Sequence, residues 1–320
     1  MKSPLPHLTE LSAAQLRQYI DAEATFTALE QATKEAAEVR GSMFWRHQGE
    51  HTYLIRTSAA GAQTSLGPHS QENIAIHDRF VERKQMAEER VKNLRGALQQ
   101  HQRLNRALRI GRAPTIVVDT LDAIARAGLD AHFLVVGTHA LFAYEAAAGV
   151  MVESGATATQ DVDLLFDTRK RLSFWSQLKR LDSSFLSVLR KADRSFRLRP
   201  GQLYTVVNDA GFEVDVVRRI KSESDPHPFR LSDDEGDLWP VQIPTGQDLL
   251  NAERFSRIVV SAAGSMARMQ TIDPRAFVRV KRWLSEQSAR DPLKRRKDVL
   301  QADIVSSLVQ NYLPQLDIQA

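Results

Sequence analysis

The most informative segment of the chain is Thr159-Gln160-Asp161-Val162-Asp163-Leu164-Leu165-Phe166-Asp167, an apolar stretch with two aspartates near its start. Its alternation predicts a β-strand in which Asp161 and Asp163 leave one face, while the apolar residue between them points into a core. Aspartate is disfavoured in strands, and adjacent carboxylates repel unless a cation or a proton joins them. Solvated acids on an edge strand are the alternative interpretation. Oxygen ligands without Cys or His suit Mg²⁺ or Mn²⁺, so we expect a metal site here.

Upstream of this strand, Val135-Val136-Gly137-Thr138 ends an apolar segment and begins a helical one. Gly137 allows the backbone to turn tightly and a ligand to come close. The amide of Thr138 then lies at a helix start, where free N–H groups and the helix dipole favour phosphate. A glycine at this place is common in α/β proteins, so the turn indicates phosphate binding only in combination with the acidic strand.

A third acidic strand is predicted downstream, at Phe212–Val217. Glu213 and Asp215 share one face of this strand. If it lies beside the first acidic strand, Asp215 completes a carboxylate triad with Asp161 and Asp163. We prefer Asp215 to Glu213 because a short side chain gives tighter geometry. Such triads hold the metal ions of phosphoryl and nucleotidyl transfer and activate the attacking hydroxyl.

These residues resemble a known family. Gly137-Thr138, Asp161-Val162-Asp163 and Asp215 are similar to the pattern of the DNA polymerase β nucleotidyltransferase superfamily. The run from Thr159 to Asp163 is similar to the Thr-x-Asp-h-Asp signature of its AbiEii-like branch of type IV toxins and abortive-infection proteins. Two departures are visible: Thr138 replaces the usual Gly or Ser, and the gap before Asp161 implies a longer helix or a loop inserted at Ala148–Ala158.

The C-terminal region extends the resemblance to the Arg-x-Lys-Asp motif and the preceding lone lysine of AbiEii-like enzymes. The matching positions are Lys281, Arg295, Lys297 and Asp298. The resemblance implies that the basic residues bind the nucleotide, with Lys281 and Lys297 neutralising the triphosphate. It implies that Asp298 orients Lys297 or acts as a base. The family expects a further acid, where this chain has Gln301 and Asp303 nearby. A solvated basic helical face is the alternative interpretation.

The composition limits the classes of protein. The 320 residues include 42% hydrophobic residues and a net charge of +4, which is ordinary for a globular chain. Cysteine is absent, which excludes disulfides, cysteine-ligated zinc, iron–sulfur clusters and thiol catalysis. The start lacks the apolar core of a signal peptide, and His132–Val152 is too polar for a membrane span. We therefore expect a cytoplasmic protein without membrane contact.

The expected fold class is α+β: a nucleotidyltransferase-fold mixed β-sheet core flanked by helices. In the N-terminal part, the residue pattern predicts a helix at Ser12–Arg40, short strands at Met43–Gly67 and a long polar helix at Ser70–Leu108. After Pro244 the pattern is typical of helices to the end of the chain. The three expected parts are an N-terminal helical and β-hairpin module (1–110), a catalytic core (111–244) and a C-terminal helical region that contributes basic nucleotide-binding residues (245–320).

The resulting hypothesis is a Mg²⁺-dependent nucleotidyltransferase that transfers an NMP from an NTP to an acceptor hydroxyl. Asp161, Asp163 and Asp215 hold the metal, and Asp215 helps to deprotonate the acceptor. The acceptor is an RNA 3′ end, with tRNA implied by the toxin branch, or a protein side chain. The resemblance also implies a toxin-like enzyme with a cognate antitoxin.

The alternative is a nucleic-acid-binding regulatory protein with a vestigial nucleotidyltransferase core. In this interpretation the N-terminal hairpin, the long polar helix and the basic C-terminal segment bind nucleic acid. Substitution separates the two hypotheses, because only the enzyme needs Asp161 and Asp163, whereas binding depends on Arg295 and Lys297.

Overall fold

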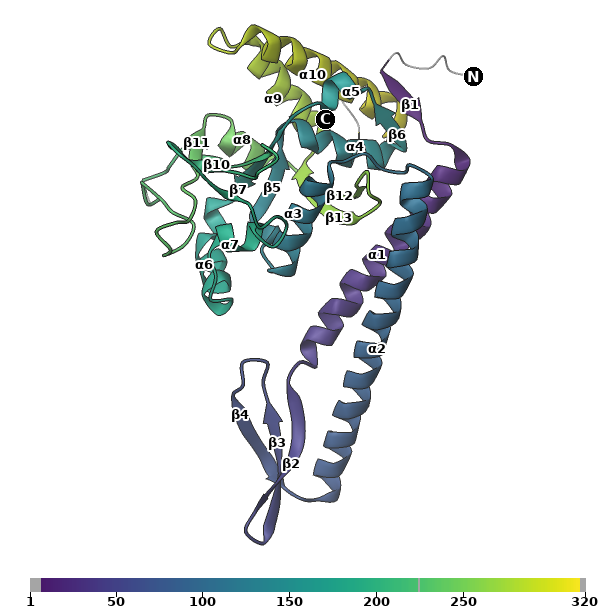
Figure 1. Ribbon diagram of the computed structural model, residues 1–320, viewed down its shortest axis with the longest axis vertical. Coiled ribbons are helices and arrows are strands. Elements are labelled where there is room, and N and C mark those ends of the chain that lie inside the picture. Colours follow the sequence, from purple (N-terminus) through teal and green to yellow (C-terminus); the bar gives the residue numbers. More distant parts are fainter. Residues whose placement is uncertain (1–6, 224, 317–320) are drawn as a thin grey trace. The chain divides into compact units, whose positions relative to one another are not determined.

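A computed structural model describes residues 7–223 and 225–316 (Figure 1). The described chain forms two compact units. The first contains the residues up to Leu16 together with those from Asn105 onward, and the second contains Arg17–Leu104. In the described residues, no helix has the length and apolar character needed to cross a membrane. The division into parts 1–110, 111–244 and 245–320 stays a prediction.

The unit 17–104 consists of two long helices and a three-stranded antiparallel sheet. Its elements are α1 (Ala13–Glu38), β2 (Ser42–Gln48), β3 (His51–Thr57), β4 (Gln63–Pro68) and α2 (Gln71–Ala107). The helices are joined by an ion pair of 2.8 Å between Glu35 and Arg90. The sheet packs on α2, where the Arg56 guanidinium lies 4.4 Å from the centre of the Phe80 ring. Strand β2 thus adds a third strand to the expected hairpin.

A mixed sheet forms the centre of the other unit. Its strands are β5 (Phe133–Val136), β7 (Asp161–Phe166), β8 (Arg197–Arg199), β9 (Gln202–Val207), β10 (Glu213–Arg219) and β11 (Val241–Ile243). They lie in the order β5-β7-β10-β9-β8, with β11 also paired to β10. The pairs β7–β10 and β10–β11 are parallel and the others antiparallel. The expected mixed sheet flanked by helices is therefore present.

Two apolar clusters cover opposite faces of this sheet. Leu164 packs in one cluster with α3 (Thr115–Arg126), α6 (Arg171–Arg180) and α7 (Phe185–Leu189). Leu165 packs in the other with α4 (Leu141–Ala148), α9 (Pro274–Glu286) and α10 (Pro292–Tyr312). Each fully buried aliphatic side chain contributes about 1.5–3 kcal/mol. Strand alternation places Asp161 and Asp163 on the face of Leu165, so they face the side that α4, α9 and α10 cover.

The expectation that the chain is helical from residue 245 to its end is wrong for residues 254–272. After α8 (Gly246–Asn251), the strands β12 (Arg254–Val260) and β13 (Met266–Ile272) form an antiparallel hairpin. The run Ile258-Val259-Val260 is buried throughout, so it lacks the alternation that marks a half-exposed strand. The Thr271 hydroxyl donates to the Val135 carbonyl over 2.6 Å, which joins the hairpin to β5.

The segment 148–158, expected to be a longer helix or an inserted loop, contains two short elements. Strand β6 (Val150–Val152) pairs antiparallel with β1 (Leu8–Glu10), and α5 (Ser154–Thr157) leads into the first acidic strand. The remaining short elements are the 3₁₀ turns η1 (Asp130–His132), η2 (Gly137–Ala140) and η3 (Thr168–Lys170). The first acidic strand is thus approached through ordered structure.

Candidate active site

Three aspartates meet at the beginning of two neighbouring parallel strands. In the register of β7 and β10, Asp163 lies opposite Asp215, and Asp161 lies opposite Glu213. One carboxylate oxygen from each of Asp161, Asp163 and Asp215 lies within 4.8 Å of the others, and all three residues are half-buried. A set of three carboxylates at this spacing fits a hard divalent cation such as Mg²⁺.

Hydroxyl groups orient two of these carboxylates. The Thr159 hydroxyl donates to Asp161, and the Thr205 hydroxyl on β9 donates to Oδ1 of Asp215 over 2.6 Å. Glu213, the competing candidate for the third position, is instead ion-paired with Arg199. The geometry therefore groups Asp215, rather than Glu213, with the other two aspartates.

The charges of the triad are poorly compensated by the surrounding protein. Burial raises the pKa of Asp163 to about 7, and the charges of Asp161 and Asp215 add to this increase. The cations Lys281 and Arg290 oppose it. Burial also raises the pKa of Asp215, against the effect of the Thr205 hydrogen bond. A divalent cation replaces the missing positive charge, so the electrostatics favour metal binding at this place.

Gly137 makes close approach to the triad possible. Its φ is +71°, in the left-handed region that favours glycine. A Cβ atom at this position would overlap the Asp163 carboxylate. The antiparallel register of β5 and β7 brings Val136 opposite Asp163, so η2 begins beside the carboxylates. The predicted phosphate-binding turn, Gly137-Thr138, is therefore next to the predicted metal ligands.

Gln301 of α10 supports this turn through a hydrogen bond to Thr138. The side chain is fully buried, and its Nε2 donates to the Ala156 carbonyl over 2.6 Å and to the Thr138 hydroxyl over 3.2 Å. The sequence placed Gln301 only near the position of an expected acid. The only sequence signal for this role is a glutamine in a predicted helix, three residues after the Arg-x-Lys-Asp motif, and that signal is weak.

The C-terminal helices bring a buried charge cluster to the same place. The Asp298 carboxylate accepts hydrogen bonds from Lys281 Nζ over 2.8 Å and from Arg290 Nε over 2.9 Å. The resemblance implied that Asp298 orients Lys297 or acts as a base, and its hydrogen-bonding partners here are Lys281 and Arg290. Sequence reasoning missed Arg290, which lies in the connection between α9 and α10 and outside every motif.

The two other predicted basic residues differ in their surroundings. Lys297 Nζ donates to the Ala158 carbonyl over 2.6 Å. This carbonyl lies three residues before Asp161. Burial and the Lys281 charge lower the pKa of Lys297, whereas the charges of Asp161 and Asp298 raise it. For Arg295, no side-chain hydrogen bond or ion pair connects it to the site within residues 7–223 and 225–316. Its role in nucleotide binding stays a prediction.

His139 follows the phosphate turn and is 1% exposed. Burial lowers its pKa to about 4, although the charge of Asp161 opposes this decrease. Its ring stacks on Phe142 at 5.6 Å between centroids, and neither ring nitrogen has a hydrogen-bond partner in the part of the chain that is described. His139 is therefore neutral at pH 7 and packs beside the site.

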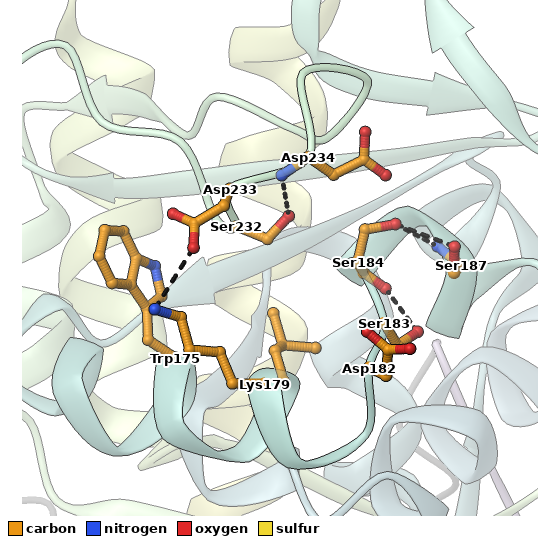
Figure 2. A pocket seen from close by; sticks show the side chains of 10 residues that line it. Trp175, Lys179, Asp182, Ser183, Ser184, Ser187, Ser232, Asp233 and Asp234 are labelled. Carbon is orange, nitrogen blue, oxygen red and sulfur yellow. Dashed lines mark hydrogen bonds and ion pairs between the residues drawn. The ribbon is translucent and has the colours of Figure 1, made fainter.

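A separate cavity of about 370 Å³ lies between α6, the segment that precedes α7, and residues 232–234 (Figure 2). Trp175 lines it, and an ion pair of 3.4 Å joins Lys179 and Asp233 at its wall. The cavity contains none of the predicted site residues. The carboxylate triad, and not this cavity, therefore carries the chemical argument.

One comparison with known protein families agrees with this geometry. Among curated proteins and solved structures, no match is found. A family model described as a nucleotidyltransferase matches residues 115–320, a range that includes the triad, the Gly137 turn and the charge cluster around Asp298. Because this match covers more than half of the chain, the protein belongs to that nucleotidyltransferase family and is an enzyme that transfers phosphorus-containing groups.

Proposed function

We propose that the protein catalyses Mg²⁺-dependent transfer of an NMP from an NTP to an acceptor hydroxyl, the 3′ end of an RNA such as tRNA. The observation that carries this proposal is the carboxylate triad, whose ligand oxygens lie within 4.8 Å of one another beside a glycine turn. A protein side chain is the alternative acceptor and is an outcome of the experiment below. The oxygen-only donor set supports Mg²⁺ or Mn²⁺ as the ion.

Each group near the triad has a part in this reaction. Asp161, Asp163 and Asp215 hold the divalent cation, which when bound neutralises phosphate charge and makes the α-phosphorus easier to attack. Asp215, whose pKa is raised by burial, accepts the proton of the acceptor hydroxyl. The Gly137-Thr138 turn lies against the phosphates, and Lys297 compensates their charge. The acceptor oxygen forms a bond to the α-phosphorus, the bond between this phosphorus and the oxygen that bridges it to the β-phosphate breaks, and pyrophosphate leaves.

The resemblance to AbiEii-like enzymes supports a narrower proposal. It rests on the run from Thr159 to Asp163 and on the positions of Arg295, Lys297 and Asp298. In this proposal the enzyme acts in the cytoplasm as a toxin on tRNA, and a cognate antitoxin restrains it. Expression of the wild-type chain in a bacterial host is then expected to arrest growth. An equal arrest with Asp161→Asn would show that toxicity does not depend on the reaction.

The decisive experiment is transfer of label from each α-labelled NTP in turn, with Mg²⁺ and with or without total tRNA. Asp163→Asn tests the triad, and Asp209→Asn, an exposed aspartate in the turn between β9 and β10, is the matched control. Label on RNA with the wild type and Asp209→Asn alone supports the proposal. Label on protein identifies the other acceptor class. No label from folded protein with any NTP contradicts it.

The regulatory alternative, a nucleic-acid-binding protein with a vestigial core, is less consistent with the site. Three repelling carboxylates beside a glycine turn cost stability, and a vestigial core has no physical reason to keep them. Loss of nucleic-acid binding in Arg295→Gln or Lys297→Gln, with no effect of Asp161→Asn in any assay, would favour this alternative.

A further inference from the structure

The two cations that share the Asp298 carboxylate differ in their access to solvent. The Lys281 side chain is 8% exposed and Asp298 is 2% exposed, whereas the Arg290 side chain is 31% exposed. A residue that binds an incoming anion needs accessible donors. The exposure therefore separates the two cations, although both contact the same carboxylate.

Lys281 is enclosed. Its Nζ donates to Asp298 over 2.8 Å and lies 5.5 Å from the centre of the Phe277 ring. If this ammonium moved away to bind a phosphate, the buried Asp298 carboxylate would lose one of its two cations, which is strongly unfavourable. Lys281 thus acts as a fixed counter-ion, and its charge also lowers the pKa of Asp163.

Arg290 still has donors to offer. It binds Asp298 through Nε alone, and no hydrogen bond within the described ranges uses its terminal nitrogens. A guanidinium can bind phosphate oxygens in a bidentate manner, which an ammonium cannot do. Asp298, which holds the guanidinium, lies about one helical turn before Gln301 on α10. Gln301 donates to the Thr138 hydroxyl, so Arg290 is held at the part of α10 that faces the proposed phosphate turn.

We propose that Arg290 binds the phosphates of the NTP that leave as pyrophosphate, while Asp298 positions its guanidinium and Lys281 remains a counter-ion. This inference rests on the proposed nucleotidyltransferase reaction. It differs from the role implied by the resemblance, in which Lys281 itself neutralises the triphosphate. A guanidinium held in place by Asp298 would stabilise the charge that develops on the leaving pyrophosphate.

The test is binding of magnesium tripolyphosphate to the full chain, measured by isothermal titration calorimetry. Arg290→Gln is expected to weaken binding by about 10-fold to 100-fold, the usual effect of losing charge-assisted hydrogen bonds. Arg290→Lys keeps the positive charge but cannot donate to two phosphate oxygens in a bidentate manner, so its affinity is expected to be intermediate. Arg296→Gln, which removes an exposed cation on α10, is the matched control and should bind as the wild type does.

Thermal unfolding without ligand separates binding from folding. Lys281→Met is expected to lower the melting temperature more than Arg290→Gln, because it removes the more buried partner of Asp298. Wild-type affinity in folded Arg290→Gln would overturn the inference and leave the proposed function intact. If Arg290→Gln is unfolded, Arg290→Lys decides, because wild-type affinity in that variant also overturns it. No binding of magnesium tripolyphosphate by the wild type would also overturn the inference, whereas the labelling experiment decides the proposed function.

Discussion

At the residue scale, Gly137 and Asp163 depend on each other. The glycine adopts φ of +71°, and any side chain there would meet the Asp163 carboxylate. This close approach is possible only because β5 ends opposite Asp163 in the antiparallel register. A backbone position thus sets how near the phosphate turn comes to the metal ligands.

Gly137→Ala is expected to destabilise the fold by about 1–3 kcal/mol because of the positive φ. It should also weaken Mn²⁺ binding at least tenfold, since the new methyl group displaces Asp163. Calorimetric titration with Mn²⁺ and urea unfolding measure the two effects. Gly201→Ala is the matched control, because Gly201 has φ of +77° but open space around it. Equal Mn²⁺ affinity in both variants would contradict this account.

His139 gives a prediction for the pH dependence of stability. Its pKa is about 4 in the folded chain and 6.5 ordinarily, so the unfolded chain binds more protons between these values. Stability therefore falls as the pH decreases from 6.5 to 4, by about 3 kcal/mol from this residue. Urea unfolding at a series of pH values should show a shallower decrease for His139→Leu. The same slope in both proteins would exclude this role.

At the element scale, α10 organises the site by contacting segments far away in sequence. Lys297 and Gln301, about one helical turn apart, donate to the carbonyls of Ala158 and Ala156. These two bonds fix the segment that precedes Asp161. The C-terminal helix thus sets the starting point of the first acidic strand.

Gln301→Ala is expected to lower the free energy of unfolding by about 2–3 kcal/mol, because it leaves a cavity and removes the donor from a buried carbonyl and a half-buried hydroxyl. It should also raise the KM for NTP more than it lowers kcat, since the Thr138 turn loses its support. Urea unfolding and steady-state kinetics measure both. Gln310→Ala, exposed on the same helix, is the control. A pure stability loss with unchanged KM would argue against the positioning role.

The sequence predicted the elements whose signal is local. Alternating acidic and apolar residues predicted the two acidic strands, and Gly137 predicted the turn before them. Each of these signals depends on a few consecutive residues. The hairpin at 254–272 was missed because a short buried apolar run fits a strand or a helix equally well. The partners of Asp298 were missed because adjacent helical residues point in different directions, and Arg290 comes close only in the folded chain.

At the scale of the whole molecule, the unit that contains the triad folds around negative charge that nearby cations compensate only in part. Asp163, with its pKa raised to about 7, favours the protonated form in the folded chain. Without metal, its contribution therefore destabilises the fold as the pH rises from about 4 to 7. Binding of a metal ion is expected to reverse this effect, because the proposed site exists in the folded triad and not in the unfolded chain.

Removal of the metal should therefore destabilise the wild type and leave Asp163→Asn unchanged. In EDTA at pH 8, Asp163→Asn is expected to melt several degrees above the wild type, because it lacks the buried charge. With millimolar Mn²⁺, the wild type should gain stability and the variant should not. Scanning calorimetry provides both melting temperatures. A Mn²⁺-dependent increase of equal size in both proteins would place the metal elsewhere.

The chain leaves the catalytic unit after Leu16 and re-enters it at Asn105. On the catalytic side of these crossings, Gln15 Nε2 donates to the Leu108 carbonyl over 3.0 Å, so the outgoing and returning segments are neighbours. The unit 17–104 is therefore inserted into the other unit. If it is removed, a short linker is enough to join Leu16 to Asn105, because the segments that contain them are neighbours. Every proposed metal and phosphate ligand lies outside the insertion, so a chain without residues 17–104 keeps all of them.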